Sequence, residues 1–166
     1  MTGYNVHRIV AGAYRRWLPT GAKYFMAPYS IRKGPNVYGL VFGSGHPRGI
    51  DKFLRVAWAK GGDANFFIDR DRIDSQTLML PEMETPNKLR EYEAALRSDV
   101  LNGKLGTNKE IYIFGLEHGV LASHSRAVID RMLAQGDLPK QTIHISYDAW
   151  AKQACGEQIL LKEDAP

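Results

Sequence analysis

The chain has 166 residues, enough to bury a hydrophobic core as one domain or as two small ones. Its 44% hydrophobic and 24% charged residues are typical of a globular protein and exclude a disordered or fibrous one. No run of about 18 apolar residues occurs and the N-terminus lacks a secretory pattern, so we expect no membrane partner. The single cysteine, Cys155, excludes an internal disulfide and a cysteine-rich zinc site, and favours a cytoplasmic location.

The charge is divided unevenly along the chain. Residues 1–62 contain ten Lys and Arg against Asp51 alone, a net charge of +9, so the other 104 residues carry −5 of the total of +4. A first third this basic suits a polyanion or an acidic neighbouring domain, because clustered charge attracts the opposite sign. The alternative is a solvated basic face without a specific partner.

Residues 1–62 are predicted to form a helix, two strands and a second helix. Residues 6–18 place apolar side chains at helical spacing, and Pro19 ends the pattern. Residues 22–31 and 36–44 are rich in β-branched and aromatic residues and flank a Gly-Pro turn, which indicates a strand pair. The next apolar pattern has helical spacing from Pro47 to the glycine pair 61–62. Residues 63–84 are interpreted as a linker.

Three helices are predicted in residues 85–166. Thr85 is suited to cap the first helix, which would start at Pro86 and stop near Gly103. Thr107 and Glu110 have the spacing of a capping box, so the IYIF run after them is interpreted as a second helix rather than a strand. The second helix should stop at Gly119, and Ser123 should cap a third that runs to Gln135 and ends at Gly136.

A strand pair is expected after the third helix. Ile143, Ile145 and Tyr147 alternate as in a half-buried strand, and residues 158–162 could return as its partner. Three helices followed by a strand pair is the order of a winged helix, with the helix-turn-helix within residues 85–147. The predicted fold class is therefore α/β: a sheet segment at 1–62, a linker at 63–84 and a winged-helix domain at 85–166.

In a helix-turn-helix the third helix carries the residues that reach nucleic acid, nearest its N-terminus. The predicted contacts on this helix are Ser123, His124, Arg126 and Arg131. Its surroundings are electrically neutral, with four basic and four acidic residues between Thr107 and Lys140, so counterion release would be small. Protein docking therefore stays open beside DNA or RNA binding. In the nucleic-acid version the basic first unit extends the surface through Arg15, Arg16, Arg48, Lys52 and Arg55.

A glycine-rich turn also resembles a dinucleotide fingerprint. Gly43, Gly45 and Gly49 lie between a predicted strand and a predicted helix, and Asp69 stands where a ribose-binding acid belongs. The helical pattern after Thr85 leaves no room for the other strands of a doubly wound sheet. We therefore favour a structural strand-to-helix turn over a dinucleotide site, and expect no cofactor, metal site or catalytic residue in this chain.

Three stretches are similar to a known family. YGLVFGSGHPRGIDKFLRVAWA (38–59) resembles the strand, turn and helix of the bacterial three-Cys-motif partner proteins. EIYIFGLEHGVLASHSRAVIDRMLAQGDL (110–138) is similar to the C-terminal helix-turn-helix of that family, and HISYDAWAKQ (144–153) to the strand after it. The resemblance extends over residues 6–162.

The resemblance implies a role and a partner. The N-terminal part would be the C-terminal edge of a Rossmann-like, methyltransferase-type sheet whose glycine motif lies upstream, since no D-x-F-A-G-x-G-like segment occurs here. The partner would be a radical-SAM-like protein that carries the three cysteines. The leading hypothesis is thus an accessory protein that binds this partner, nucleic acid or both through a winged helix. The alternative is a fragment of an S-adenosylmethionine-dependent methyltransferase, which predicts an upstream strand and glycine-rich turn.

Overall fold

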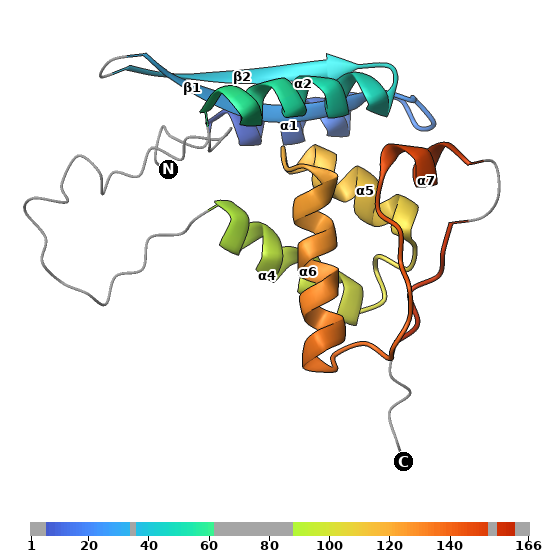
Figure 1. Ribbon diagram of the computed structural model, residues 1–166. Helices are drawn as coiled ribbons and strands as arrows, with labels where there is room; N and C mark the ends of the chain where they lie inside the picture. Colours follow the sequence, from blue (N-terminus) through green and yellow to red (C-terminus); the bar gives the residue numbers. More distant parts are fainter. Residues whose placement is uncertain (1–5, 34–35, 62–87, 153–155, 162–166) are drawn as a thin grey trace, which may run out of the picture.

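The computed structural model describes residues 6–33, 36–61, 88–152 and 156–161, which form a mixed arrangement of helices and one antiparallel strand pair (Figure 1). None of the helices in these ranges is long and apolar enough to cross a membrane. In chain order the elements are α1 (Val6–Trp17), β1 (Phe25–Lys33), β2 (Asn36–Ser44), α2 (Pro47–Gly61), α4 (Lys88–Leu101), α5 (Asn108–Glu117), α6 (Ala122–Gln135) and α7 (Tyr147–Ala151).

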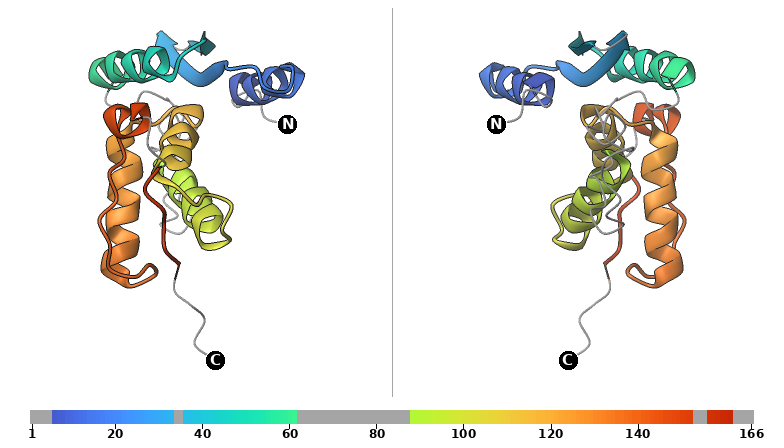
Figure 2. Two further views of the ribbon diagram at one scale, coloured as in Figure 1. Left: turned by 90° about the vertical axis from the view of Figure 1, so that its right-hand side faces the viewer. Right: turned by 90° about the vertical axis from the view of Figure 1, so that its left-hand side faces the viewer.

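The strand pair lies between α1 and α2, one helix on each face (Figure 2). Phe42 of β2 stacks on Phe53 of α2 with ring centroids 4.3 Å apart, and Tyr29 of β1 meets Phe53 edge-on. On the other face Gly39 lies so close to α1 that a Cβ there would be 2.7 Å from the Cβ of His7. Both faces of the hairpin are therefore covered, which explains why β2 is almost continuously apolar.

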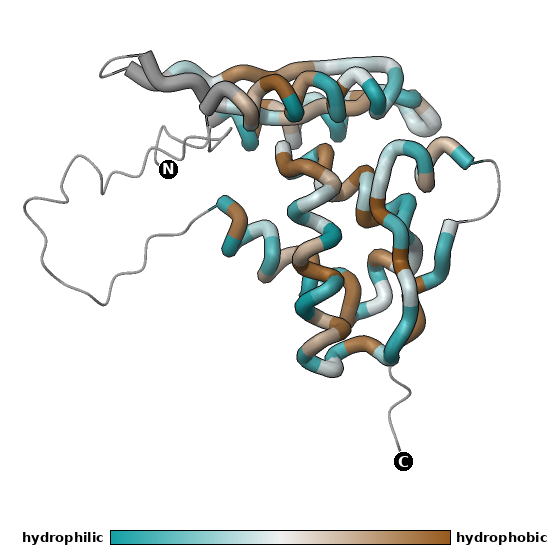
Figure 3. Tube along the Cα trace, in the orientation of Figure 1, coloured by the Kyte–Doolittle hydropathy of each residue, from teal (hydrophilic) through white to brown (hydrophobic). Residues whose placement is uncertain are grey.

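Helices α4, α5 and α6 form a separate layer below the hairpin (Figure 1). Hydrophilic and hydrophobic residues alternate along α6, as expected for a helix with one buried face (Figure 3). The close approach of α5 and α6 requires Gly115, because a Cβ there would be 2.6 Å from the Oγ of Ser125. One hydrophobic core joins the two layers, since Ile50 and Leu54 of α2 belong to the same cluster as Leu116.

Most predicted elements are confirmed, with shifted ends. Thr107 Oγ1 accepts from Glu110 N at 3.2 Å, as the capping box requires, but the Glu110 carboxylate accepts from Gly106 N rather than from Thr107 N. Gly136 ends α6 in the left-handed conformation, with φ of 74°. The prediction of Ser123 as a cap is wrong: the N-cap is Leu121, α6 begins at Ala122, and Ser123 lies in its first turn. The predicted cap at Thr85 and the linker 63–84 lie outside the described residues.

The prediction of a strand pair after α6 is wrong, because the described backbone there forms no strand ladder. Residues 142–145 form no ladder, and Ser146 starts the short helix α7 because its Oγ accepts from Ala149 N at 3.1 Å. Residues around Gln158 bridge to Thr107, ahead of α5, instead of to the segment after α6. The backbone partner expected for residues 142–147 is thus taken by a different part of the chain.

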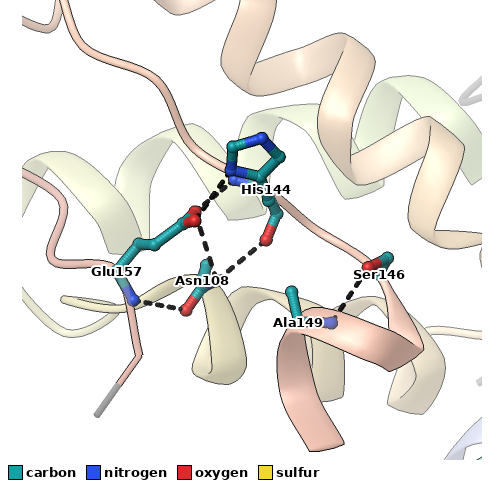
Figure 4. A network of polar contacts seen from close by, with 5 residues as sticks. All are labelled: Asn108, His144, Ser146, Ala149 and Glu157. Atoms are coloured by element: carbon teal, nitrogen blue, oxygen red, sulfur yellow. Dashed lines mark hydrogen bonds and ion pairs between the residues drawn. The ribbon is translucent and has the colours of Figure 1, made fainter. Parts of the chain in front are cut away.

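Side chains replace the missing ladder (Figure 4). The carboxylate of Glu157 accepts from the backbone N–H of His144 and contacts its ring at 2.7 Å. Asn108 joins both segments, since its amide donates to the His144 carbonyl at 2.8 Å and its oxygen accepts from Glu157 N. Burial raises the pKa of Glu157, but the hydrogen bonds from His144 outweigh it and the pKa lies below its ordinary value.

Candidate nucleic-acid interface

The two arginines predicted on the third helix are exposed, and both face acids of the same chain. Arg131 of α6 forms a two-point ion pair with Glu93 of α4, at 3.0 and 2.7 Å. Arg126 lies 3.7 Å from Asp130 one turn along α6. Such surface pairs are weak, about 0–1 kcal/mol, so the arginines can exchange partners, but each phosphate contact would first break a pair.

The N-terminal end of α6 lies against α2. His124 packs on Trp58 with ring centroids 4.4 Å apart, and its Nδ1 accepts from Leu121 N at 3.2 Å. Ser125 is buried and shares a 2.6 Å hydrogen bond with the hydroxyl of Tyr92. Of the first four residues of α6, only Ser123 is exposed. The part of a recognition helix that normally approaches the base edges is thus largely covered by this protein's own layers.

Arg15 of α1 is engaged inside the fold. Its guanidinium donates to the carbonyls of Met26, at 2.6 Å, and Glu117, at 2.7 Å. Burial lowers the pKa of Arg15, and the carboxylate of Glu117 partly offsets this. A cation at the end of α5 also complements the helix dipole. Arg15 therefore holds α1, β1 and α5 together rather than facing solvent.

The remaining predicted cations do face solvent. Arg16 is exposed at the end of α1, next to Arg15. On α2, Lys52 is exposed, Arg48 lies 5.0 Å above the ring of Tyr147, and Arg55 pairs with the buried Asp51 at 2.9 Å. The structure thus keeps two separate groups of exposed cations on the first layer, one at the end of α1 and one along α2.

Exposed aromatic residues around the end of α1 were missed by the sequence reasoning. Trp17 is 76% exposed, and its ring meets that of Tyr14, itself 49% exposed, edge-on at 5.6 Å. Tyr24, 44% exposed, and Lys23 follow on the connection to β1. These exposed residues at the end of α1 and on the connection to β1 are called the α1 platform: Tyr14, Arg16, Trp17, Lys23 and Tyr24. The signal in the sequence was the interleaving of aromatic residues with cations from 14 to 24.

Trp17 is exposed because α1 does not bury the whole apolar face that the sequence pattern predicted to be buried. The apolar stripe contains Ile9 and Trp17, which are both exposed, whereas His7 and Ala11 are buried. Arg8 and Arg15 fix which side of α1 faces the helical layer, because they donate hydrogen bonds to the Glu91 carboxylate and the Glu117 carbonyl in that layer. These long-range polar contacts turn part of the apolar stripe outward.

Packing explains two of the three glycines of the fingerprint-like turn, Gly43 and Gly49. A Cβ at Gly43 would be 2.6 Å from the hydroxyl of Tyr24, and one at Gly49 would clash with the Oγ of Ser44. His46 occupies the N-terminus of α2, where its Nδ1 accepts from Arg48 N at 3.2 Å and its carbonyl from Gly49 N. Since Pro47 has no N–H, few donors are left there for a phosphate.

The part of the chain that the structure describes contains no group of three or more His, Cys, Asp or Glu able to hold a metal ion. Comparisons with protein-family models, with curated proteins and with solved structures found no match.

Proposed function

We propose that this protein binds single-stranded nucleic acid through the α1 platform. The observation that carries the proposal is the 76% exposed ring of Trp17, which meets Tyr14 edge-on and is flanked along the chain by the exposed cations Arg16 and Lys23. Flat aromatic rings stack on unpaired bases, typically for about 1–3 kcal/mol per base. Neighbouring cations neutralise the phosphates and release counterions. The net charge of +9 on residues 1–62 adds attraction over a longer range.

The platform supports single strands better than α6 supports a duplex. The cations of α6, Arg126 and Arg131, are paired with acids, while Arg16 and Lys23 are exposed and each is next to an exposed aromatic residue in the chain. A duplex presents its bases only at groove edges, so exposed rings contribute little to binding it. We therefore expect oligonucleotides without secondary structure to bind more tightly than duplexes of the same length.

Fluorescence anisotropy of a labelled single-stranded oligonucleotide tests the proposal. Trp17→Ala should weaken binding about 5- to 150-fold, the equivalent of one lost stacking contact. Arg16→Gln should weaken binding and reduce the salt slope by about 0.7, the value for one phosphate contact on a single strand. Arg126→Gln is the matched control on α6 and should leave the affinity unchanged. Absence of binding at low salt, or equal losses in Arg16→Gln and Arg126→Gln, would contradict the proposal.

We also propose that the helical layer is a winged helix in which side chains hold the wing. Its support is the order of the segments: residues 106–108 precede α5, residues 141–145 follow α6, and residues 157–160 lie between these two. The middle segment forms backbone hydrogen bonds with 106–108, including one in which Ile159 N donates to Gly106 O at 2.9 Å. Gln141 takes the place of a strand backbone, because its side-chain amide bonds both the N–H and the carbonyl of Leu160. Slow amide exchange at Ile159 and faster exchange at Ile143 is the expected pattern.

The edge of a larger Rossmann-like sheet stays a proposal for residues 1–62, supported by the helices on both faces of the hairpin. The accessory role beside a radical-SAM-like three-cysteine protein and the alternative of a methyltransferase fragment rest on the resemblance of residues 38–59 and 110–138. Co-purification with a three-cysteine protein encoded nearby tests the first. An upstream reading frame with a strand and a glycine-rich turn tests the second.

A further inference from the structure

The outer edge of β2, which is the edge that does not pair with β1, is a second surface besides the α1 platform. Nine residue pairs join β1 to β2 without a break, and the centre of β2, Leu40, pairs with Tyr29. β1 lies on the side of the helical layer, where it contacts α5 and its Met26 carbonyl accepts from Arg15. The other edge of β2 faces away from that layer (Figure 1). Among the described residues, no strand pairs with this edge.

This edge lacks the features that normally prevent edge-to-edge pairing. β2 has the sequence NVYGLVFGS, with neither a charged residue nor a proline, and its register contains no bulge. Natural edge strands are usually short, charged or interrupted. A nine-residue, regular and uncharged edge is instead typical of a strand with neighbours on both sides.

Apolar side chains flank the edge. Tyr38 and Leu40 of β2 are 52% and 40% exposed, and Val56 of α2 is 59% exposed. Gly49 lies against Ser44 and Phe53 stacks on Phe42, so α2 runs antiparallel along β2. Val56, one turn after Phe53, therefore lies beside the middle of the strand, near Leu40.

We infer that a second copy of this chain pairs with β2, forming a two-fold dimer with a four-stranded sheet. Antiparallel pairing about an axis perpendicular to the sheet, centred on Leu40, gives the strand order β1-β2-β2-β1. Each hairpin is about 10 Å wide, twice the strand spacing of about 4.8 Å. The α2 helices of the two copies would thus be about 10 Å apart, which is the packing distance of helices. The same holds for α1 on the other face.

The size of the edge face is sufficient for a stable dimer. Nine extended residues span about 30 Å, and a helix, a sheet and a helix stacked together are also about 30 Å thick. The resulting area of about 900 Å² per copy matches the roughly 800 Å² per partner of a standard interface. A second copy also supplies the helices that must cover both faces of the added strands, which an isolated peptide would not.

The charge predicts how salt affects this dimer. Two units of +9 repel each other, and salt screens exposed charges beyond about 10 Å at 0.1 M. Dimerisation should therefore strengthen as salt rises, whereas nucleic-acid binding should weaken. The opposite salt responses distinguish failure of this inference from failure of the proposed function.

Analytical ultracentrifugation of the full chain over about a hundredfold range of concentration tests the dimer. Leu40→Lys should raise the dimer dissociation constant about tenfold or more, because it buries two unpaired cations at the two-fold axis. Leu101→Lys, at a leucine of α4 that is 47% exposed, is the matched control and should leave the constant unchanged. Circular dichroism of each variant shows that the fold is retained.

A disulfide tests the register independently of Leu40→Lys. In a Cys155→Ser background, Leu40→Cys should crosslink two copies under mild oxidation, because facing residues of antiparallel strands have Cα atoms about 4.5–5.5 Å apart. Leu101→Cys in the same background should stay monomeric on a non-reducing gel. A wild-type chain that is monomeric at every concentration and salt, including one whose own residues 62–87 cover the edge, overturns the inference. A dimer that tolerates Leu40→Lys and gives no crosslink at 40 overturns it as well.

Discussion

The indole N–H of Trp58 on α2 donates to the carbonyl oxygen of Gly119, in the turn between α5 and α6, at 3.1 Å. The same carbonyl accepts from the buried ammonium of Lys88 at 2.6 Å. Arg15 donates to the carbonyl of Glu117, two residues earlier. Side chains from α1, α2 and α4 thus donate hydrogen bonds to the backbone at the end of α5 and in the turn after it. The turn between α5 and α6 is thus part of the junction between the layers, and Trp58 connects it to α2.

Trp58→Phe should destabilise the protein by about 1 kcal/mol, because it removes one hydrogen bond while an aromatic ring is kept. For a chain of this size that corresponds to a fall in Tm of about 2–4 °C. Thermal unfolding followed by circular dichroism measures the change. Trp17→Phe is the matched control: its ring is 76% exposed, so Tm should not move. An unchanged Tm in Trp58→Phe would show that Lys88 alone holds the Gly119 carbonyl.

Short-range signals allowed much of the fold to be predicted. Thr107 and Glu110 are three residues apart, so their capping bond depends on little beyond the local sequence. Gly136 likewise ends α6 through its own left-handed conformation. Local signals could not show whether residues 142–147 form a strand, because this depends on residues 157–159, which pair with the segment ahead of α5 instead.

The candidate site was less predictable for the same reason. Arg15 has the sequence context of an exposed cation, yet it donates to the Glu117 carbonyl, 102 residues away. Trp17 has the spacing of a buried residue, yet the contacts of Arg8 and Arg15 with the helical layer leave it in solvent. Long-range polar contacts decide which side of an amphipathic helix is buried, and the apolar pattern does not encode them.

Gly115→Ala should destabilise the protein by about 1–3 kcal/mol, the usual cost of overpacking a core. The added methyl group would be 2.6 Å from Ser125 Oγ and 3.2 Å from the hydroxyl of Tyr92, and both groups are buried. Urea unfolding measures the change. The double variant Gly115→Ala/Ser125→Ala should lose less than the sum of the two single variants, because removal of the hydroxyl relieves the clash.

Gly12→Ala is the control for this prediction. The nearest atom to a Cβ at Gly12 of α1 is an Arg16 nitrogen at 3.9 Å, so the methyl group fits without strain. Alanine is favoured over glycine within a helix by about 0.5–1 kcal/mol, and this variant should be as stable as the wild type or more stable. Equal losses in the Gly12 and Gly115 variants would contradict the close α5–α6 crossing.

His118 should make stability depend on pH. Burial lowers the pKa of His118 below its ordinary value of 6.5; the Phe114 carbonyl acts in the opposite direction, while Arg15, Arg8 and Lys88 lower the pKa further. As the pH falls through 6.5 the unfolded chain takes up a proton that the folded chain still excludes. The unfolded state is then favoured, so stability is lost from pH 6.5 down to the lower pKa of the folded state.

His118→Gln removes the group that takes up this proton, so the Tm of the variant should depend less on pH. At a pH well above 6.5 the imidazole is neutral in both states, so the difference in Tm between wild type and variant measures only the altered contacts of the side chain. That difference is the internal control. As the pH is lowered below 6.5, the wild type should lose Tm faster than His118→Gln, and the gap between them should shrink or change sign. Parallel Tm curves across this window would mean that His118 is protonated as readily in the folded protein as in the unfolded chain.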